Sequence, residues 1–294
     1  MAPPEANSDV KAREKDVHWY TADLETVSEP ARQLLEKYSG IPPDQVVPHI
    51  LEIRDRAWSI FPYPCIGRFH FLELSISLSP LYPTILKRMI ESKHTLLDMG
   101  CCLAQDVRKL VSDGAPSENI YGAELRQEFI DLGYDLFRDR DRLKSKFLIG
   151  DVFDDSDEFE FKQIDGGIDI IYAASIFHLF NWDDQVRVAE KVVRLLRPVR
   201  GSIVFGRQRG NVNPAEYEHR TNQGGPMFRH NQDSWKKMWQ QVGKSTGTEW
   251  DVNVTLETGR NDADLFEADG PAPGFDGNKR SKGDGSLRFQ VVRV

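Results

Sequence analysis

The stretch Thr95–Leu110, TLLDMGCCLAQDVRKL, decides the fold predicted for this chain of 294 residues. It begins as a short apolar strand, turns at Gly100 and continues in a pattern typical of an amphipathic helix. A strand, a glycine turn and a helix open a nucleotide-binding α/β unit. Asp98 ends the strand, while Cys102 and Ala104 occupy positions that usually carry glycine in such loops. The stretch therefore predicts a ligand-binding turn with an acid beside it.

The same alternation continues along the chain. Further β-like runs occupy residues 119–125, 146–151, 168–175 and 202–206, and helical patterns occupy residues 105–111, 127–138 and 184–196. Five strands that alternate with helices imply a parallel, doubly wound sheet. A helical pattern at 231–242 then precedes two late runs, 250–258 and 286–294, which a polar loop joins and which should pair antiparallel. The prediction is an α/β fold with a Rossmann-like seven-stranded sheet.

The residues before the sheet form two predicted parts. Residues 1–25 are Pro-rich and charged at their start, which predicts a flexible arm, and residues 26–92 read as a helical cap. The cap is expected to act as a substrate lid, with a dimer segment as a second candidate role, ahead of a ligand-binding domain at 93–294. Its large apolar side chains suit a hydrophobic acceptor, but they equally suit plain packing or a dimer interface. These side chains are Phe61, Tyr63, Phe69, Phe71, Leu72, Leu81 and Tyr82.

Composition limits the class of partner. The net charge of −8 argues against a non-specific grip on nucleic acid. No apolar run reaches the roughly 18 residues that a membrane span needs, and the N-terminus lacks a secretory pattern. The three cysteines, Cys65, Cys101 and Cys102, have no metal-ligand spacing. We therefore expect a cytoplasmic protein with no nucleic-acid partner, no membrane partner and no metal.

Acidic residues at the ends of successive strands distinguish between two kinds of ligand. Asp98 and Asp106 would repel a pyrophosphate, whereas S-adenosylmethionine has no phosphate and carries an ammonium group that an acid can hold. Glu124 ends the second strand, where an acid can accept hydrogen bonds from ribose hydroxyls. Asp151 follows the third strand and can receive the adenine amino group, while Val152 offers its amide to the ring. The three strand-end acids favour S-adenosylmethionine over NAD.

These motifs resemble class I S-adenosylmethionine-dependent methyltransferases over residues 95–206. The first motif is matched by LLDMGCC, the second by Glu124 and the third by Asp151, and RLLRPVRGSIVFG resembles the turn into the fifth strand. The tail that begins at Trp250 fits their reversed final strand. The resemblance implies S-adenosylmethionine as cofactor and an antiparallel last strand.

A closer resemblance covers nearly the whole chain. The segments YPCIGRFHFLELSISL, GCCLAQDVRKL and YDLFRDRD are similar to fungal methyltransferases of meroterpenoid gene clusters. These resemble homodimeric enzymes that esterify a carboxylic acid on the polyketide-derived part of a substrate. The resemblance therefore implies a homodimer, a hydrophobic small-molecule acceptor and a methyl ester as product.

Together these patterns give a predicted cofactor set: Tyr20, Asp98, Gly100, Cys102, Gln105, Glu124, Leu125, Asp151, Val152 and Ala174. Cys102 and Ala104 depart from the general motif, in which glycines stand at both places. A Cβ at position 102 narrows the approach to the methionine portion and costs energy if φ is positive. Both residues are small, so we expect the loop to bind, with Gln105 bonded to the amino-acid end of the cofactor. Tyr20 either covers the cofactor or docks the arm.

The acceptor side offers several candidates. His178 follows the fourth strand and is the predicted catalytic residue, although a core histidine is an equal alternative. Arg207 and Arg209, expected just after strand five, and Arg229 suit a substrate carboxylate, but a solvated surface position is the plainer interpretation of any one of them. The predicted reaction is O-methylation of a carboxylic acid. A phenol methyltransferase with His178 as base and a degenerate, non-catalytic binding subunit remain as alternatives.

Overall fold

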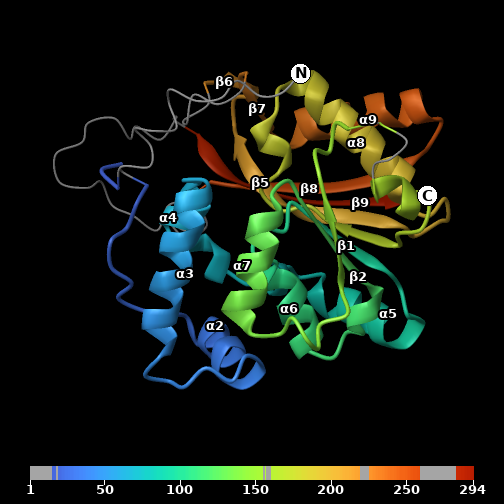
Figure 1. Cartoon of the computed structure of the whole chain (residues 1–294). Coiled ribbons are helices and arrows are strands. Elements are labelled where there is room, and N and C mark those ends of the chain that lie inside the picture. The colour runs from blue at the N-terminus through green and yellow to red at the C-terminus, as the bar shows by residue number, and fades with distance from the viewer. Residues whose placement is uncertain (1–14, 18, 155, 157–159, 219–224, 259–282) are drawn as a thin grey trace.

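Seven strands form one sheet in the order β3-β2-β1-β4-β5-β9-β8 (Figure 1). This computed structural model describes residues 15–17, 19–154, 156, 160–218, 225–258 and 283–294. The strands are β1 (Leu96–Met99), β2 (Ile120–Glu124), β3 (Lys146–Ile149), β4 (Ile170–Tyr172), β5 (Ile203–Asn211), β8 (Trp250–Glu257) and β9 (Asp284–Arg293). The first five are parallel, and β9 is antiparallel to both of its neighbours. The predicted seven-stranded Rossmann-like sheet is confirmed.

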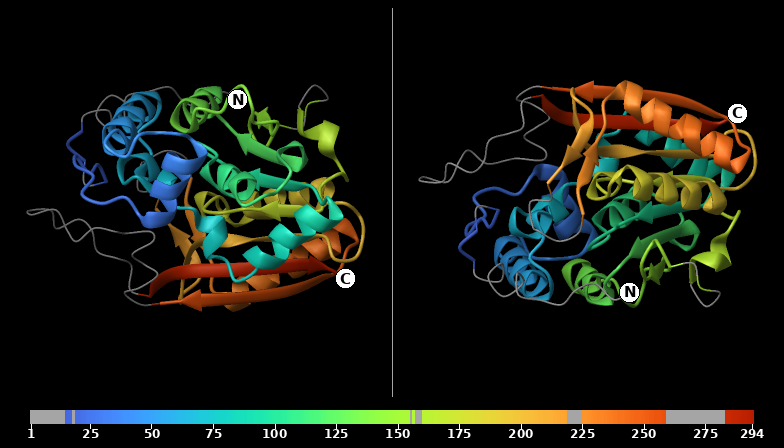
Figure 2. Two further views of the ribbon diagram at one scale, coloured as in Figure 1. Left: turned by 90° about the horizontal axis from the view of Figure 1, so that it is seen from below. Right: turned by 90° about the horizontal axis from the view of Figure 1, so that it is seen from above.

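Helices cover both faces of the sheet (Figures 1 and 2). On one face lie η5 (Glu160–Ile164), α8 (Trp182–Leu195) and α9 (Gln232–Thr246), and on the other lie α5 (Tyr82–Ser92), α6 (Gln105–Ser112) and α7 (Gln127–Phe137). The central strands are apolar on both sides because both faces are covered. Short 3-10 turns, η4 (Ser117–Asn119) and η6 (Phe177–Leu179), join the elements.

Side-chain caps fix where the two C-terminal helices begin. Asn181 accepts a hydrogen bond from the amide of Asp184 at 2.9 Å and so caps the start of α8. Asn231 and Ser234 form a capping box at the start of α9. Among the described residues, no helix combines the length and the apolarity that a membrane crossing requires.

The N-terminal segment is a set of short helices beside α7: α2 (Glu29–Gln33), the π-helix η1 (Leu34–Tyr38), α3 (Val46–Ile60), α4 (Pro64–Gly67), η2 (His70–Leu72) and η3 (Ser75–Leu78). Their apolar residues between 31 and 74 share one buried cluster with residues of α7 and with Leu103 of the turn after β1. Helix α5 is buried instead in the cluster of α6 and the sheet. The predicted cap, 26–92, therefore divides between two cores.

Most of the expected arm, residues 1–25, lies outside the described residues. The part that is described is bonded to the cap. The amide of Thr21 donates to the carbonyl of Gly67 at 2.9 Å, and Arg54 Nη2 donates to the carbonyl of Ala22 at 3.0 Å. These bonds join residues 21 and 22 to the helical segment.

Strand β5 is longer than the sequence predicted, because β9 pairs with it from Ile203 to Asn211 rather than stopping near Gly206. As a result, Arg207 and Arg209 lie within the strand, so their expected place after strand five was wrong. A two-stranded ribbon, β6 (Ala215–Tyr217) and β7 (Met227–Arg229), was also not predicted. Strands of three residues are too short to show a periodic pattern.

Candidate functional site

The turn that follows β1 keeps the backbone course of a glycine loop. The φ angles are 76° at Gly100, 53° at Cys102 and 55° at Ala104. The condition under which a Cβ at position 102 costs energy, a positive φ, is therefore met. Each non-glycine residue in this conformation costs about 1–2 kcal/mol. A Cβ added at Gly100 would lie 3.3 Å from Cδ1 of Ile176, so the turns after β1 and β4 meet here.

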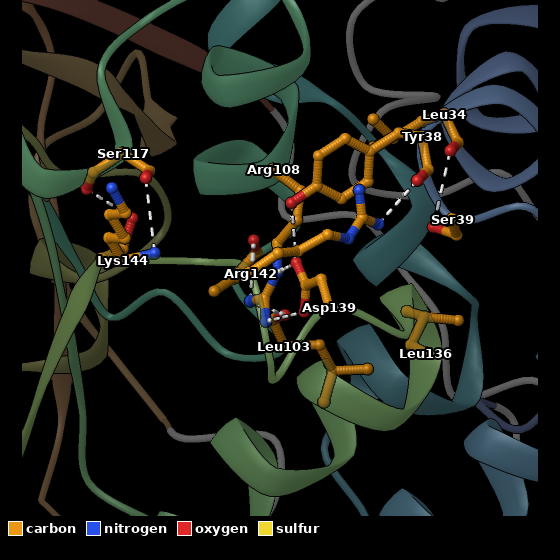
Figure 3. Close-up of polar contacts among 12 residues, drawn as sticks. Leu34, Tyr38, Ser39, Leu103, Arg108, Ser117, Leu136, Asp139, Arg142 and Lys144 are labelled. Atoms are coloured by element: carbon orange, nitrogen blue, oxygen red, sulfur yellow. Dashed lines mark hydrogen bonds and ion pairs between the residues drawn. The ribbon is translucent and has the colours of Figure 1, made fainter.

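A buried ion pair supports this strained turn (Figure 3). Arg108 Nη1 donates to the carbonyls of Leu103 and Ala104 at 3.2 and 3.4 Å. Its Nε and Nη2 donate to the two oxygens of Asp139 at 3.0 and 3.1 Å, and both side chains are fully buried. The hydroxyl of Tyr38 donates to Asp139 at 2.8 Å. The pair therefore joins the turn, α6, the segment just after α7 and the cap in one hydrogen-bonded cluster.

Asp98 is a buried acid at the end of β1, paired in register with Gly122 of β2 and Tyr172 of β4. Only 4% of it is exposed, and within the described part of the chain it accepts no hydrogen bond. Burial raises the pKa of Asp98 well above its usual range, and the nearby carboxylates Asp106 and Glu124 raise it further. A cation placed beside Asp98 would relieve this unfavourable charge.

Gln105 supplies a second acceptor near the turn. Its Oε1 is buried in the first turn of α6 and has no hydrogen-bond partner among the described residues. A buried acceptor without a donor is unfavourable unless a ligand or water supplies one. An ammonium group carries three donors. Asp98 and Gln105 therefore fit the charged amino-acid end of S-adenosylmethionine.

Glu124 connects the turns after β1 and β2. Its Oε2 accepts from the amide of Cys102 at 3.0 Å, and its Oε1 accepts from the amide of Arg126 at 3.2 Å. Burial raises the pKa of Glu124, and these backbone bonds oppose the rise. A carboxylate has about four acceptor sites, so both oxygens can still receive ribose hydroxyls. Its predicted role is compatible with this geometry.

The remaining predicted cofactor residues lie on the loops after β2, β3 and β4. Asp151 is exposed, and its Oδ1 accepts from the amide of Phe153 at 2.9 Å, so it also caps its own turn. Val152 and Ala174 are half-buried, and Leu125 is 52% exposed. All four follow the carboxyl ends of parallel strands, where open α/β sheets bind ligands. Their contacts with the cofactor stay predictions.

Asp106, expected to act by repelling phosphate, holds the cap instead. Its two oxygens accept from the amide of Ile76 at 3.0 Å and from the hydroxyl of Ser75 at 3.1 Å. The Ser75 hydroxyl also lies 2.7 Å from the hydroxyl of Tyr172. Burial raises the pKa of Asp106 to about 6, although these bonds lower it. The cap thus covers the end of β4 through a polar contact beside Asp98.

Tyr20 packs against the cap helix α3. Its hydroxyl donates to Asp55 at 3.0 Å, its ring lies 4.8 Å from that of Trp58, and the Arg54 guanidinium lies 4.4 Å from its ring centre. These contacts match the docking alternative that the sequence left open. A direct contact with the cofactor stays a prediction.

His178 lies in η6, directly after β4, and is half-buried. Its position agrees with the expected place of a substrate-facing group. Its role as a base stays a prediction.

A charged pair connects the cap to strand β5. Arg207 of β5 is buried, and its Nη2 donates to Oε2 of Glu73 at 2.5 Å. Glu73 lies between η2 and η3 of the cap, and His70 Nε2 is 3.9 Å from its Oε1. Burial, together with the positive charges of Arg68 and Arg207, lowers the pKa of His70 to about 3, so its ring is neutral at pH 7. Arg207 therefore already binds a carboxylate.

The other two arginines proposed for a substrate acid are used inside the protein. Arg229 donates to both oxygens of Asp284 at 2.8 and 3.0 Å, and Arg209 lies 3.4 Å from the same carboxylate. Arg229 is buried and Arg209 is 13% exposed at its side chain. Neither is a solvated surface position, and both tie β5 and β7 to the start of β9.

Sequence comparison identifies the family. Residues 19–72 match the meroterpenoid methyltransferase N-terminal domain, and residues 96–199 match a methyltransferase domain. The O-methyltransferase phiE of Fungal sp. (strain ATCC 74256) is 50% identical over 245 residues, which cover 83% of this chain and 81% of that protein. This chain belongs to the meroterpenoid methyltransferase family. The methyltransferase uses S-adenosylmethionine, as the sequence predicted.

Two further relatives agree. The O-methyltransferase atr3 of Stereocaulon alpinum is 45% identical over 267 residues, which cover 91% of this chain and 77% of atr3. The asnovolin E/chermesin D methyltransferase nvfJ of Aspergillus novofumigatus is 43% identical, with coverages of 78% and 81%. The predicted place in fungal secondary metabolism is confirmed.

Solved structures share the fold. Phosphoethanolamine N-methyltransferase 2 of Haemonchus contortus, in complex with S-adenosylhomocysteine, aligns with a TM-score of 0.51 at 17% identity and covers 82% of the methyltransferase and 59% of that chain. The [4+2]-cyclase SpnF aligns with a TM-score of 0.50 at 14% identity, over 71% and 79%. At these identities the likeness concerns the fold alone.

Several site residues of the methyltransferase carry no signal that a single sequence would reveal. Glu73 is 134 positions from Arg207, and Asp139 is 31 positions from Arg108. An acid that pairs inside the fold and an acid that faces water look alike in a single sequence. Only the folded chain brings these partners together.

Proposed function

We propose that this methyltransferase forms a methyl ester on a hydrophobic carboxylic acid of polyketide–terpenoid origin. One observation carries the proposal: Arg207, buried under the cap, already binds a carboxylate. The charges of Arg207 and Asp106 act on each other, and those of Arg207 and Asp98 both act on the Tyr172 hydroxyl. A second acidic group in this position would lie near the methyl donor.

A carboxylate acceptor makes few chemical demands on the protein. S-adenosylmethionine supplies a methyl group that its positive sulfur has already activated. A carboxylic acid is ionised at neutral pH, so no general base is needed. Asp98, Gln105 and Glu124 would hold the cofactor and Arg207 would orient the acceptor oxygen. Such positioning alone lowers a barrier by several kcal/mol.

A hydrophobic acceptor rests on the family and on exposed apolar side chains. Leu78 at the end of η3 and Leu179 in η6 are 51% and 42% exposed, on the cap and directly after β4. Most of the aromatic residues expected to line the acceptor site, by contrast, are buried in the core that the cap shares with α7. Plain packing accounts for those rings, and the leucines are the better candidates for substrate contact.

The test compares matched acceptors. The full chain is incubated with methyl-labelled S-adenosylmethionine and either 2-naphthoic acid or 2-naphthol, and each product is treated with mild alkali. An ester releases labelled methanol, whereas an aryl methyl ether keeps its label. Release from the naphthoic acid product supports the proposal. Label that stays in a naphthol product, with none in naphthoic acid, would favour the phenol alternative.

The variant His178→Ala provides an independent prediction. Because a carboxylate needs no base, kcat on the acid should fall by less than about tenfold, whereas a general base contributes about 10²–10⁴-fold. The rate should also change little between pH 6 and 9. A loss above a thousandfold in kcat, with cofactor affinity retained, would make His178 the base of a phenol methyltransferase.

A further inference from the structure

The Glu73–Arg207 pair joins the cap to the sheet on the acceptor side. Glu73 lies in the link between η2 and η3, and Arg207 lies in β5, opposite Arg288 of β9. The side chains are 21% and 8% exposed, so the pair is largely shielded from water. This ion pair therefore holds the cap against strand β5 while it is intact.

The charges around Glu73 favour an anion. Burial raises the pKa of the Glu73 carboxyl, and the Arg207 guanidinium opposes that rise. Arg68 and Arg207 both act on His70 as positive charges, and His70 itself stays neutral. The His70 Nε2 atom is buried and neither donates nor accepts a hydrogen bond among the described residues. A carboxylate at this position therefore meets the positive charge of Arg207 and the unbonded Nε2 of His70.

The same cap segment also contacts Asp106, whose charge acts on Asp98. Asp106 accepts hydrogen bonds from Ser75 and Ile76, two and three residues after Glu73. Both Arg207 and Glu73 act electrostatically on Asp106. A group that replaced Glu73 on Arg207 would therefore act on Asp106, whose charge in turn acts on Asp98, and it would free one of the contacts that hold the cap.

We propose that Glu73 is an internal stand-in for the acceptor: its carboxylate occupies Arg207 in the empty enzyme and exchanges with the carboxylate of the incoming acid. This inference rests on the proposed function. Glu73 then sets specificity, because only an acceptor that can replace a carboxylate on Arg207 gains access. An uncharged acceptor offers nothing in exchange.

The test measures binding of 2-naphthoate and 2-naphthol to the full chain by calorimetry, with S-adenosylhomocysteine present. If Arg207 is available to a ligand about one-tenth of the time, removing the competitor improves apparent affinity about tenfold. Glu73→Gln should therefore bind 2-naphthoate about tenfold more tightly and 2-naphthol unchanged. Glu73→Asp, which shortens the side chain, should give a smaller gain in the same direction and serves if the first variant does not fold. Glu257→Gln, in a Glu–Arg pair with Arg288 that is more exposed, is the matched control and should change neither ligand.

Unchanged or weaker binding of 2-naphthoate in the Glu73 variants would overturn the inference and make the pair a structural tie. The two proposals fail separately. If the enzyme makes an ester and Glu73→Gln does not tighten binding of 2-naphthoate, the stand-in role of Glu73 is wrong and the proposed ester-forming function stands. If it methylates 2-naphthol alone while Glu73→Gln tightens 2-naphthoate binding, the ester-forming function is wrong and the exchange of carboxylates on Arg207 stands.

Discussion

The variant Asp98→Asn should bind S-adenosylmethionine on the order of 100-fold more weakly and yet be more stable than the wild type without ligand. Removing one partner of a buried charge pair costs about 2–5 kcal/mol of binding. In the ligand-free protein, by contrast, Asp98 is buried beside two other acids with no bonding partner among the described residues, so its charge opposes folding. Calorimetric titration gives the affinity, and urea unfolding gives the stability.

The gain in stability should depend on pH in a definite direction. Because the folded protein raises the pKa of Asp98, the proton is held more tightly in the folded state. Wild-type stability from this group is therefore complete below about pH 4 and is lost as the pH rises through the folded pKa. The advantage of Asp98→Asn should be small at pH 4 and larger at pH 8. Asp131→Asn, an exposed acid on α7, is the control. A variant that is less stable at pH 8 would contradict this account of Asp98.

The variant Asp139→Ala should lose about 3–5 kcal/mol of unfolding free energy. It leaves the fully buried Arg108 guanidinium without its counter-charge, and breaking such a pair costs this much. The Tyr38 hydroxyl loses its partner as well. Since Arg108 also holds the carbonyls of Leu103 and Ala104, cofactor affinity should fall together with stability. Chemical unfolding and a cofactor titration measure the two effects.

Asp131→Ala is the matched control for this loss. It breaks an ion pair with Arg140 of similar length, 2.8 Å, but both side chains are about half exposed. Exposed pairs contribute about 0–1 kcal/mol, so this variant should change stability little. Equal losses in the two variants would show that burial does not decide the strength of the Arg108–Asp139 pair.

The sequence predicted the sheet because its signal is local. Each parallel strand is an apolar run of a few residues, and Gly100 and the acids Asp98, Glu124 and Asp151 mark where three strands end. These features depend on neighbours within one turn or strand, so they survive without knowledge of the fold.

The parts that failed depend on distant partners. The length of β5 is set by β9, about eighty residues later, and so the place of Arg207 could not be read from its neighbours. Arg229 was a candidate for the substrate acid until Asp284 proved to be its partner. The role of Asp106 in holding the cap, and the buried carboxylates Glu73 and Asp139, likewise require contacts that only the folded chain supplies.

We infer that the acids at the ends of the parallel strands select a cationic, phosphate-free cofactor. Calorimetric titration of the ligand-free full chain with S-adenosylmethionine and, separately, with NAD tests it most directly. We expect saturable binding of S-adenosylmethionine at one site per chain and no heat of binding for NAD. Binding of NAD, or the absence of binding by S-adenosylmethionine, would contradict it.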